Sequence, residues 1–80
     1  MKINQLISKR TKHLMKERNW TQYQLAQRSA LPLSTVSHVL ACKSKTLTLE
    51  TLLNICRGFN MDLPDFFDKS FTLANISDDD

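Results

Sequence analysis

The sequence predicts an all-α domain, and three observations support that class. Apolar residues recur at helical spacing in successive short segments. A residue pair typical of a helix start precedes one of these segments. Almost no segment shows the alternation of apolar and polar residues expected of a half-buried strand. The 80 residues make a single domain with one modest core, which we expect to span residues 1–69 and to be followed by a tail over 70–80.

Three flanking helices are expected around a central pair. The first covers residues 4–18 and the fourth covers residues 49–59, because apolar residues recur there every three or four positions. Asp62 can cap a short fifth helix, since carboxylates accept hydrogen bonds from the unpaired amides of a helix start. These helices contribute the following apolar residues to the bundle: Ile7, Leu14, Leu49, Leu52, Ile55, Phe59, Leu63, Phe66 and Phe67.

The central pair lies within residues 21–40 and consists of two short helices joined by a tight turn. Thr21 and Gln24 match the capping-box pattern, so the first helix of the pair begins at Gln22. The second is expected over residues 33–41. Two helices joined in this way form the helix-turn-helix unit that places a recognition helix in DNA. The inward-facing residues of the pair are Leu25, Ala26, Ser29, Val36, Val39 and Leu40.

Four segments of the chain carry a resemblance to a known family. They follow one another in the family's order and at its separations, and they are residues 16–22, 25–26, 34–37 and 49–55. On these segments, the chain from residue 14 to residue 67 resembles the lambda-repressor-like family of phage repressor and Cro-type helix-turn-helix regulators. The resemblance implies a compact five-helix DNA-binding domain with its helix-turn-helix at helices two and three. The matching flanks make an ordinary helical hairpin a poor alternative.

Departures from the family pattern are also informative. The family usually has glycine at four helix ends or turns, where this chain has Asn19, Ala30, Cys42 and Asn60. Asparagine tolerates a left-handed backbone, so two of these positions remain good helix ends, whereas a left-handed cysteine is mildly strained. The single glycine, Gly58, falls inside the fourth helix, where it costs about 1 kcal/mol relative to alanine and indicates close packing.

Two further departures are expected to be coupled. Many family members place an arginine in helix one and a glutamate late in the recognition helix, and these form a partly buried ion pair. Here the two positions hold Met15 and Leu40. Because replacing both partners leaves no buried charge unpaired, we expect these side chains to be buried together.

Charge is distributed unevenly along the chain. Residues 1–45 contain nine Lys or Arg against one acidic residue, whereas residues 46–80 contain two against seven. The basic half coincides with the helix-turn-helix, as expected of a phosphate-binding face. Taken alone, such a run of charge is more often a solvated surface.

Composition argues against several other classes. No secretory signal and no apolar run of about 20 residues is present, so we expect a soluble, cytoplasmic protein without membrane association. Cys42 and Cys56 match no metal-ligand spacing with the two histidines, so reduced thiols and no metal or other cofactor are expected. The chain has no phosphate-binding glycine loop, no His-Glu-x-x-His pair and no nucleophile-base set, and an enzyme is not predicted.

The outward face of the second central helix is the expected reading face. The resemblance implies base contacts from Leu33, Ser34 and His38. Serine discriminates bases weakly, histidine can donate to guanine, and leucine can meet a thymine methyl group. Gln22 is the best candidate for a bidentate contact, or for a bridge to the DNA backbone. The complete set of expected base contacts is Gln22, Leu33, Ser34, Thr35, Ser37 and His38.

Phosphate contacts are expected around both central helices. The backbone amides at the start of the first one suit an anion, because a helix N-terminus carries partial positive charge. Lys9, Arg10 and Lys12 are as consistent with solvated side chains as with contacts to flanking phosphates. The complete set of expected phosphate contacts is Thr21, Gln27, Lys43, Ser44 and Lys45.

The predicted function is a sequence-specific double-stranded DNA-binding transcriptional regulator, a repressor that binds a palindromic operator as a homodimer. Helix five and the apolar residues 70–76 are expected to contribute to the dimer, although docking of these residues on their own domain is equally consistent with the sequence. Residues 78–80 are expected to be disordered. Two alternatives remain open: an antitoxin whose tail binds a toxin, and a protein-interaction module that has kept the fold without DNA binding.

Overall fold

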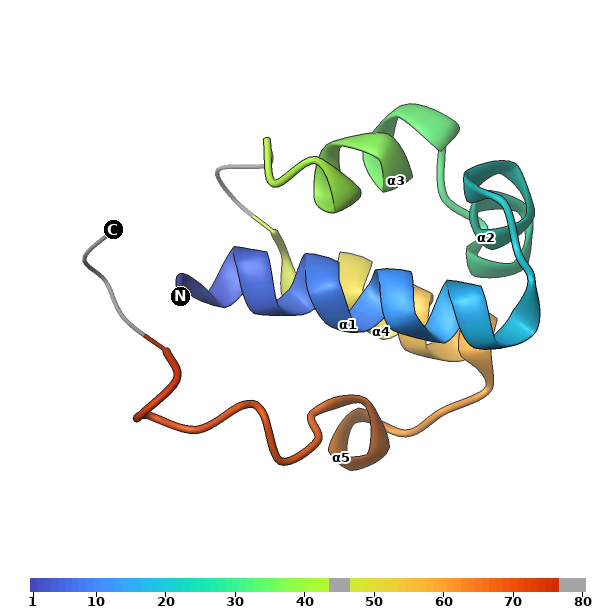
Figure 1. Ribbon diagram of the computed structural model, residues 1–80. Helices are drawn as coiled ribbons and strands as arrows, with labels where there is room; N and C mark the ends of the chain where they lie inside the picture. The colour runs from blue at the N-terminus through green and yellow to red at the C-terminus, as the bar shows by residue number, and fades with distance from the viewer. Residues whose placement is uncertain (44–46, 77–80) are drawn as a thin grey trace.

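The computed structural model describes residues 1–43 and 47–76, and over these residues it confirms the predicted all-α class. Figure 1 shows the arrangement, with α3 on one side of α1 and α5 on the other. No helix in the described ranges combines the length and the apolar character needed to cross a bilayer. The elements are α1 (Ile3–Arg18), α2 (Gln22–Ser29), α3 (Leu33–Leu40), α4 (Leu49–Phe59) and α5 (Leu63–Phe66). Every helix end for which the sequence predicted a position agrees with that position to within one residue.

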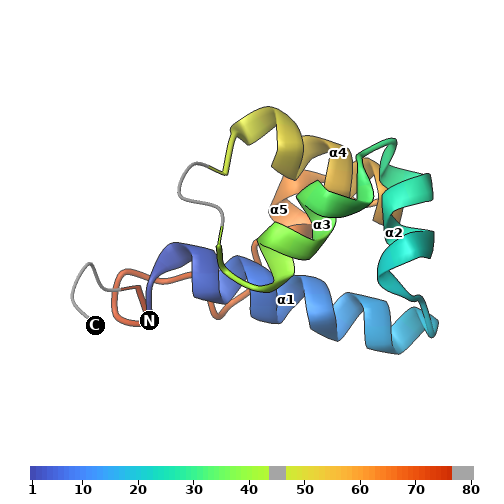
Figure 2. The same ribbon diagram turned by 90° about the horizontal axis from the view of Figure 1, so that it is seen from above.

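The core draws at least one fully buried side chain from each helix. α2 packs mainly against α4, and α3 packs against both α1 and α2. Viewed from above, α3 lies over α1 (Figure 2). Each buried aliphatic or aromatic side chain contributes about 1.5–3 kcal/mol of burial free energy. Met15 and Leu40 both belong to this core, as expected from the loss of the family's ion pair. The most buried apolar side chains are Leu14 in α1, Leu25 in α2, Val36 in α3, Ile55 and Cys56 in α4, and Phe66 in α5.

Two expectations about helix starts were wrong. Leu49 was expected to face the core, but it is 70% exposed. It is the first residue of α4, and it lines a surface groove with Leu47 and Phe67. Asp62 does occupy the position before α5, but its side chain makes no capping hydrogen bond. The cap of α4 is Thr48, whose hydroxyl oxygen accepts a hydrogen bond from the Thr51 amide at 3.1 Å.

The four positions where the family usually has glycine all adopt the left-handed conformation. The φ angles are 55° at Asn19, 55° at Ala30, 58° at Cys42 and 57° at Asn60. Each residue follows the end of a helix and lets the next amides bond back to the last turn, as the Leu31 amide does to the Ala26 carbonyl at 3.1 Å. At Ala30 and Cys42 this conformation costs roughly 1–2 kcal/mol, since neither side chain offers the local hydrogen bond of asparagine.

At Gly58, the backbone of α4 lies close against the C-terminal end of α2. A Cβ atom added at Gly58 would overlap the Ser29 hydroxyl oxygen and lie 3.2 Å from the Ser29 backbone nitrogen. The Ser29 hydroxyl is buried and has no hydrogen-bond partner in the structure. The close packing that the sequence predicted at Gly58 is therefore present, and it fixes how near α2 lies to α4.

An aromatic stack holds the start of the helix-turn-helix on α4. The rings of Trp20 and Phe59 are nearly parallel, with centroids 5.3 Å apart. The Arg28 guanidinium lies 4.6 Å from the Trp20 ring centroid, within cation–π distance. The turn between α1 and α2 is thereby attached to the far end of α4.

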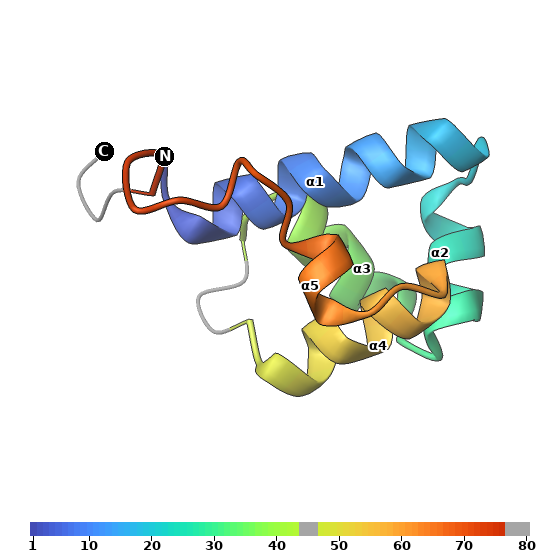
Figure 3. The same cartoon turned by 90° about the horizontal axis from the view of Figure 1, so that it is seen from below.

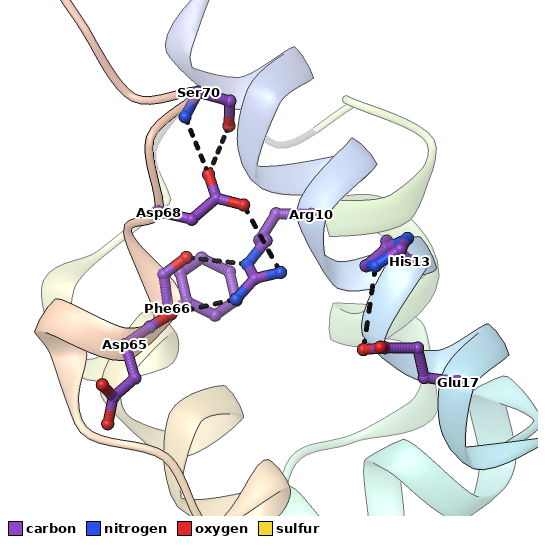
Figure 4. Close-up of polar contacts among 7 residues, drawn as sticks. All are labelled: Arg10, His13, Glu17, Asp65, Phe66, Asp68 and Ser70. Atoms are coloured by element: carbon purple, nitrogen blue, oxygen red, sulfur yellow. Dashed lines mark hydrogen bonds and ion pairs between the residues drawn. The ribbon is translucent and has the colours of Figure 1, made fainter.

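Arg10 fastens the C-terminal segment to α1. Its guanidinium donates hydrogen bonds to the Phe66 and Asp65 carbonyl oxygens, at 2.8 and 2.9 Å, and lies 3.4 Å from the Asp68 carboxylate (Figure 4). Hydrogen bonds from Ser70 lower the pKa of Asp68, and Arg10 lowers it further. The Arg10 side chain is only 15% exposed, so it is not the solvated side chain that the sequence allowed, and its guanidinium is used within the domain.

The first part of the tail docks on its own domain. The Phe71 ring meets the Phe67 ring edge-on at a centroid distance of 4.9 Å, and it also approaches Phe66. Figure 3 shows the segment running from α5 back toward the N-terminal end of α1. Leu73, in contrast, is 92% exposed. The boundary at residue 69 stays a prediction, and the expected disorder of residues 78–80 lies outside the described residues.

Gly58→Ala should destabilise the domain by about 1–3 kcal/mol, although alanine favours helix more than glycine does. The reason is the overlap of the new methyl group with Ser29. Urea unfolding followed by circular dichroism measures the change. Arg57→Ala, at the neighbouring exposed position of α4, is the control and should have a small effect. A Gly58→Ala protein as stable as the wild type would contradict the close approach.

Candidate nucleic-acid interface

The start of α2 is a capping box, as the sequence predicted. The Thr21 hydroxyl oxygen accepts from the Gln24 amide at 3.2 Å, and the Gln24 side-chain oxygen accepts from the Thr21 amide at 2.8 Å. The first-turn amides of Gln22 and Tyr23 have no acceptor within the helix. They can therefore bind a phosphate oxygen, because the partial positive charge of the helix start attracts anions.

The exposed face of α3 carries the residues expected to read bases. Val36, Val39 and Leu40 are buried. The opposite face presents Leu33, which is 47% exposed, together with Ser34 and His38. Thr35 and Ser37 are half-buried at its margins. The helix begins after Pro32, which provides no side-chain cap, so the amides of Leu33 and Ser34 have no acceptor within the helix.

A hydrogen bond joins the start of α2 to the middle of α3. The Ser37 hydroxyl donates to the Gln22 side-chain oxygen at 2.9 Å. This contact brings the expected bidentate reader, Gln22, to the same surface as Ser34 and His38. Gln22 and Ser37 lie 15 positions apart in the sequence, and no local sequence pattern predicts this hydrogen bond.

The outer face of α2 holds one polar group that sequence reasoning missed. Tyr23 is 60% exposed, and its hydroxyl oxygen accepts a hydrogen bond from the Gln27 side-chain amide at 3.2 Å. The tyrosine O–H is left to donate, and the Tyr23 backbone amide is itself one of the two open amides of the helix start. The signal available in the sequence was the i, i+4 spacing of this pair, which places both side chains on one helix face.

The chain leaves α3 through Cys42 and Lys43. The Lys43 amide bonds back to the His38 carbonyl at 3.0 Å, across the left-handed Cys42. Lys43 is exposed and lies three residues after the end of α3. Two other expected phosphate contacts, Ser44 and Lys45, lie outside the described residues.

Three arginines among residues 1–45, the basic half of the chain, make contacts within the domain. Arg10 binds the end of α5, Arg28 lies over Trp20, and Arg18 lies 5.0 Å from the Phe59 ring centroid. These side chains still add to the long-range positive field. The groups left to meet an anion are chiefly lysines, the helix starts and polar side chains.

Comparison with known proteins gives one finding. A family model described as a Cro/C1-type HTH DNA-binding domain matches residues 10–70. The match covers α2 to α5 and the later part of α1, which is more than half of the chain. No curated protein and no solved structure shows significant similarity to the chain.

Proposed function

Because the chain belongs to the Cro/C1-type helix-turn-helix DNA-binding family, we propose that this DNA-binding regulator is a sequence-specific repressor that occludes a promoter. The observation that carries the proposal is the surface formed by α3 and the start of α2. On that surface the side chains of Ser34 and His38 lie exposed, and Gln22 is hydrogen-bonded to Ser37. A helix with its polar residues exposed in this way fits the major groove of B-DNA.

In this proposal α3 lies in the major groove and α2 lies across the backbone. Leu33, Ser34 and His38 meet base edges, while the amides of Gln22 and Tyr23 hold a phosphate. Thr35 and Ser37 stand at the margins of the reading face. Phosphate contacts from Thr21, Gln27, Lys43, Ser44 and Lys45 fix the register of α3 in the groove.

Strong binding in this proposal depends on two copies. The reading face carries no arginine, and hydroxyl groups discriminate bases weakly. Two copies on a palindromic operator, with half-sites about 34 Å apart, would double the set of contacts. An apolar groove of about 300 Å³ supports such a dimer, since Ile3, Leu47, Leu49 and Phe67 line it beside α5. Fully covering a side chain such as Leu49 in this groove would favour association by about 1.5–3 kcal/mol.

The same groove is the observation that favours a second candidate, a protein-interaction module. In that case the groove and the exposed Leu73 bind another protein, such as a toxin partner, and the α3 face is not used on DNA. Binding to duplex DNA and its dependence on salt separate the two candidates.

Selection of bound duplexes from a random pool tests the proposal. We expect enrichment of an inverted repeat whose half-site centres are about one helical turn, 10–10.5 base pairs, apart. Enrichment of single half-sites would contradict the homodimer. A pool without enrichment would contradict sequence-specific binding and favour the interaction module.

Lys43→Ala should reduce the salt dependence of duplex binding. Each lost phosphate contact lowers the slope of log affinity against log salt by about one unit per protomer. Fluorescence anisotropy at several salt concentrations measures the slope. Lys69→Ala is the matched control, because it removes the same exposed charge three residues after α5, and α5 lies on the side of α1 opposite to α3 (Figure 1). Equal slopes for the two variants would contradict a contact from Lys43.

A further inference from the structure

The Gln22 side-chain amide makes a contact within the protein that turns its oxygen toward α3. Its oxygen accepts the hydrogen bond from the Ser37 hydroxyl at 2.9 Å. The amide nitrogen, at the other end of the same planar group, keeps both of its hydrogens available. The group therefore offers donors to whatever approaches the reading face.

The side chains of the two other glutamines of α2 make hydrogen bonds to residues at the start of α2 and not to α3. The Gln24 oxygen completes the capping box with Thr21, and the Gln27 amide nitrogen donates to Tyr23. Gln22 alone among the three is held against α3. Its orientation, more than its presence, then determines which base it can read.

Both ends of the Gln22–Ser37 contact belong to rigid elements. Gln22 is the first residue of α2, directly after the capping box at Thr21. Ser37 lies on α3 beside Val36, which is fully buried in the core. A side chain held before binding loses less conformational freedom on the DNA, which favours the orientation that it already has.

We propose that Ser37 is a positioning residue that makes Gln22 read a hydrogen-bond acceptor on the base. This inference rests on the proposed DNA-binding function. A glutamine that is free to turn pairs best with adenine, because it donates to N7 and accepts from the N6 amino group. With its oxygen held by Ser37, Gln22 favours guanine, whose N7 and O6 are both acceptors, or thymine through O4. Adenine is disfavoured because its amino group would face the donor end of the amide.

The test is the pool selection repeated with Gln22→Ala and Ser37→Ala. The position read by Gln22 is the one whose preference Gln22→Ala removes. At that position the wild type should favour guanine or thymine, and Ser37→Ala should raise the ratio of adenine to guanine by about fivefold or more, since the freed amide can pair with adenine. An unchanged ratio, or a Gln22→Ala variant that alters no position, would overturn the proposal.

Ser34→Ala is the matched control, because it removes a hydroxyl from the same face of α3. It should change the preference at a different base pair and leave the Gln22 position as in the wild type. An equal shift toward adenine in Ser34→Ala would show that the effect does not come from the contact with Ser37, and would also overturn the proposal.

A second readout needs no DNA. In the free protein, NMR relaxation of the Gln22 side-chain amide should show greater mobility in Ser37→Ala than in the wild type, while the Gln27 amide stays unchanged. Unchanged mobility of Gln22 overturns the positioning role even if the protein binds DNA. If the wild type enriches no duplex, the proposed function and the base preference both fail, and the mobility measurement then decides the positioning role by itself.

Discussion

The close approach of α2 to α4 at Gly58 is the constraint on which the rest of the structure depends. The backbone of α4 meets the Ser29 end of α2 with no room for a side chain. At the other end of α2, the stack of Trp20 on Phe59 holds the helix start. With α2 fixed at both ends, the turn through left-handed Ala30 determines where α3 leaves the core. The position of the exposed face of α3 is therefore set by contacts within the domain.

Local sequence signals predicted the elements of this domain well. The capping box at Thr21, the helix ends at Asn19 and Asn60, and the close packing at Gly58 each rest on residues whose backbone chemistry is specific. The prediction from helical periodicity that Leu49 is buried was wrong. Periodicity shows on which face of α4 a residue lies, but it does not show whether the core extends as far as the first turn of that helix.

Contacts between distant residues could not be predicted in the same way. Arg10 binds the Phe66 carbonyl 56 positions away, and Ser37 binds Gln22 across the helix-turn-helix. From the charge distribution, Arg10 is predicted only to be one of several cations that could contact phosphate. From helical periodicity, Ser37 is predicted only to be one of several hydroxyl groups that could contact bases. Only the packing of the helices shows that Arg10 binds the C-terminal segment and that Ser37 is hydrogen-bonded to Gln22.

The central claim is that duplex DNA binds the surface made by α3 and the start of α2. Titration of ¹⁵N-labelled protein with a duplex enriched from the random pool tests it directly, since each backbone amide reports its own surroundings. The account predicts that the largest chemical-shift changes fall at residues 21–24, 33–38 and 41–43, with little change around Leu49 and Phe67. Changes centred on the groove at Leu49 and Phe67, with the α3 face unaffected, would contradict it.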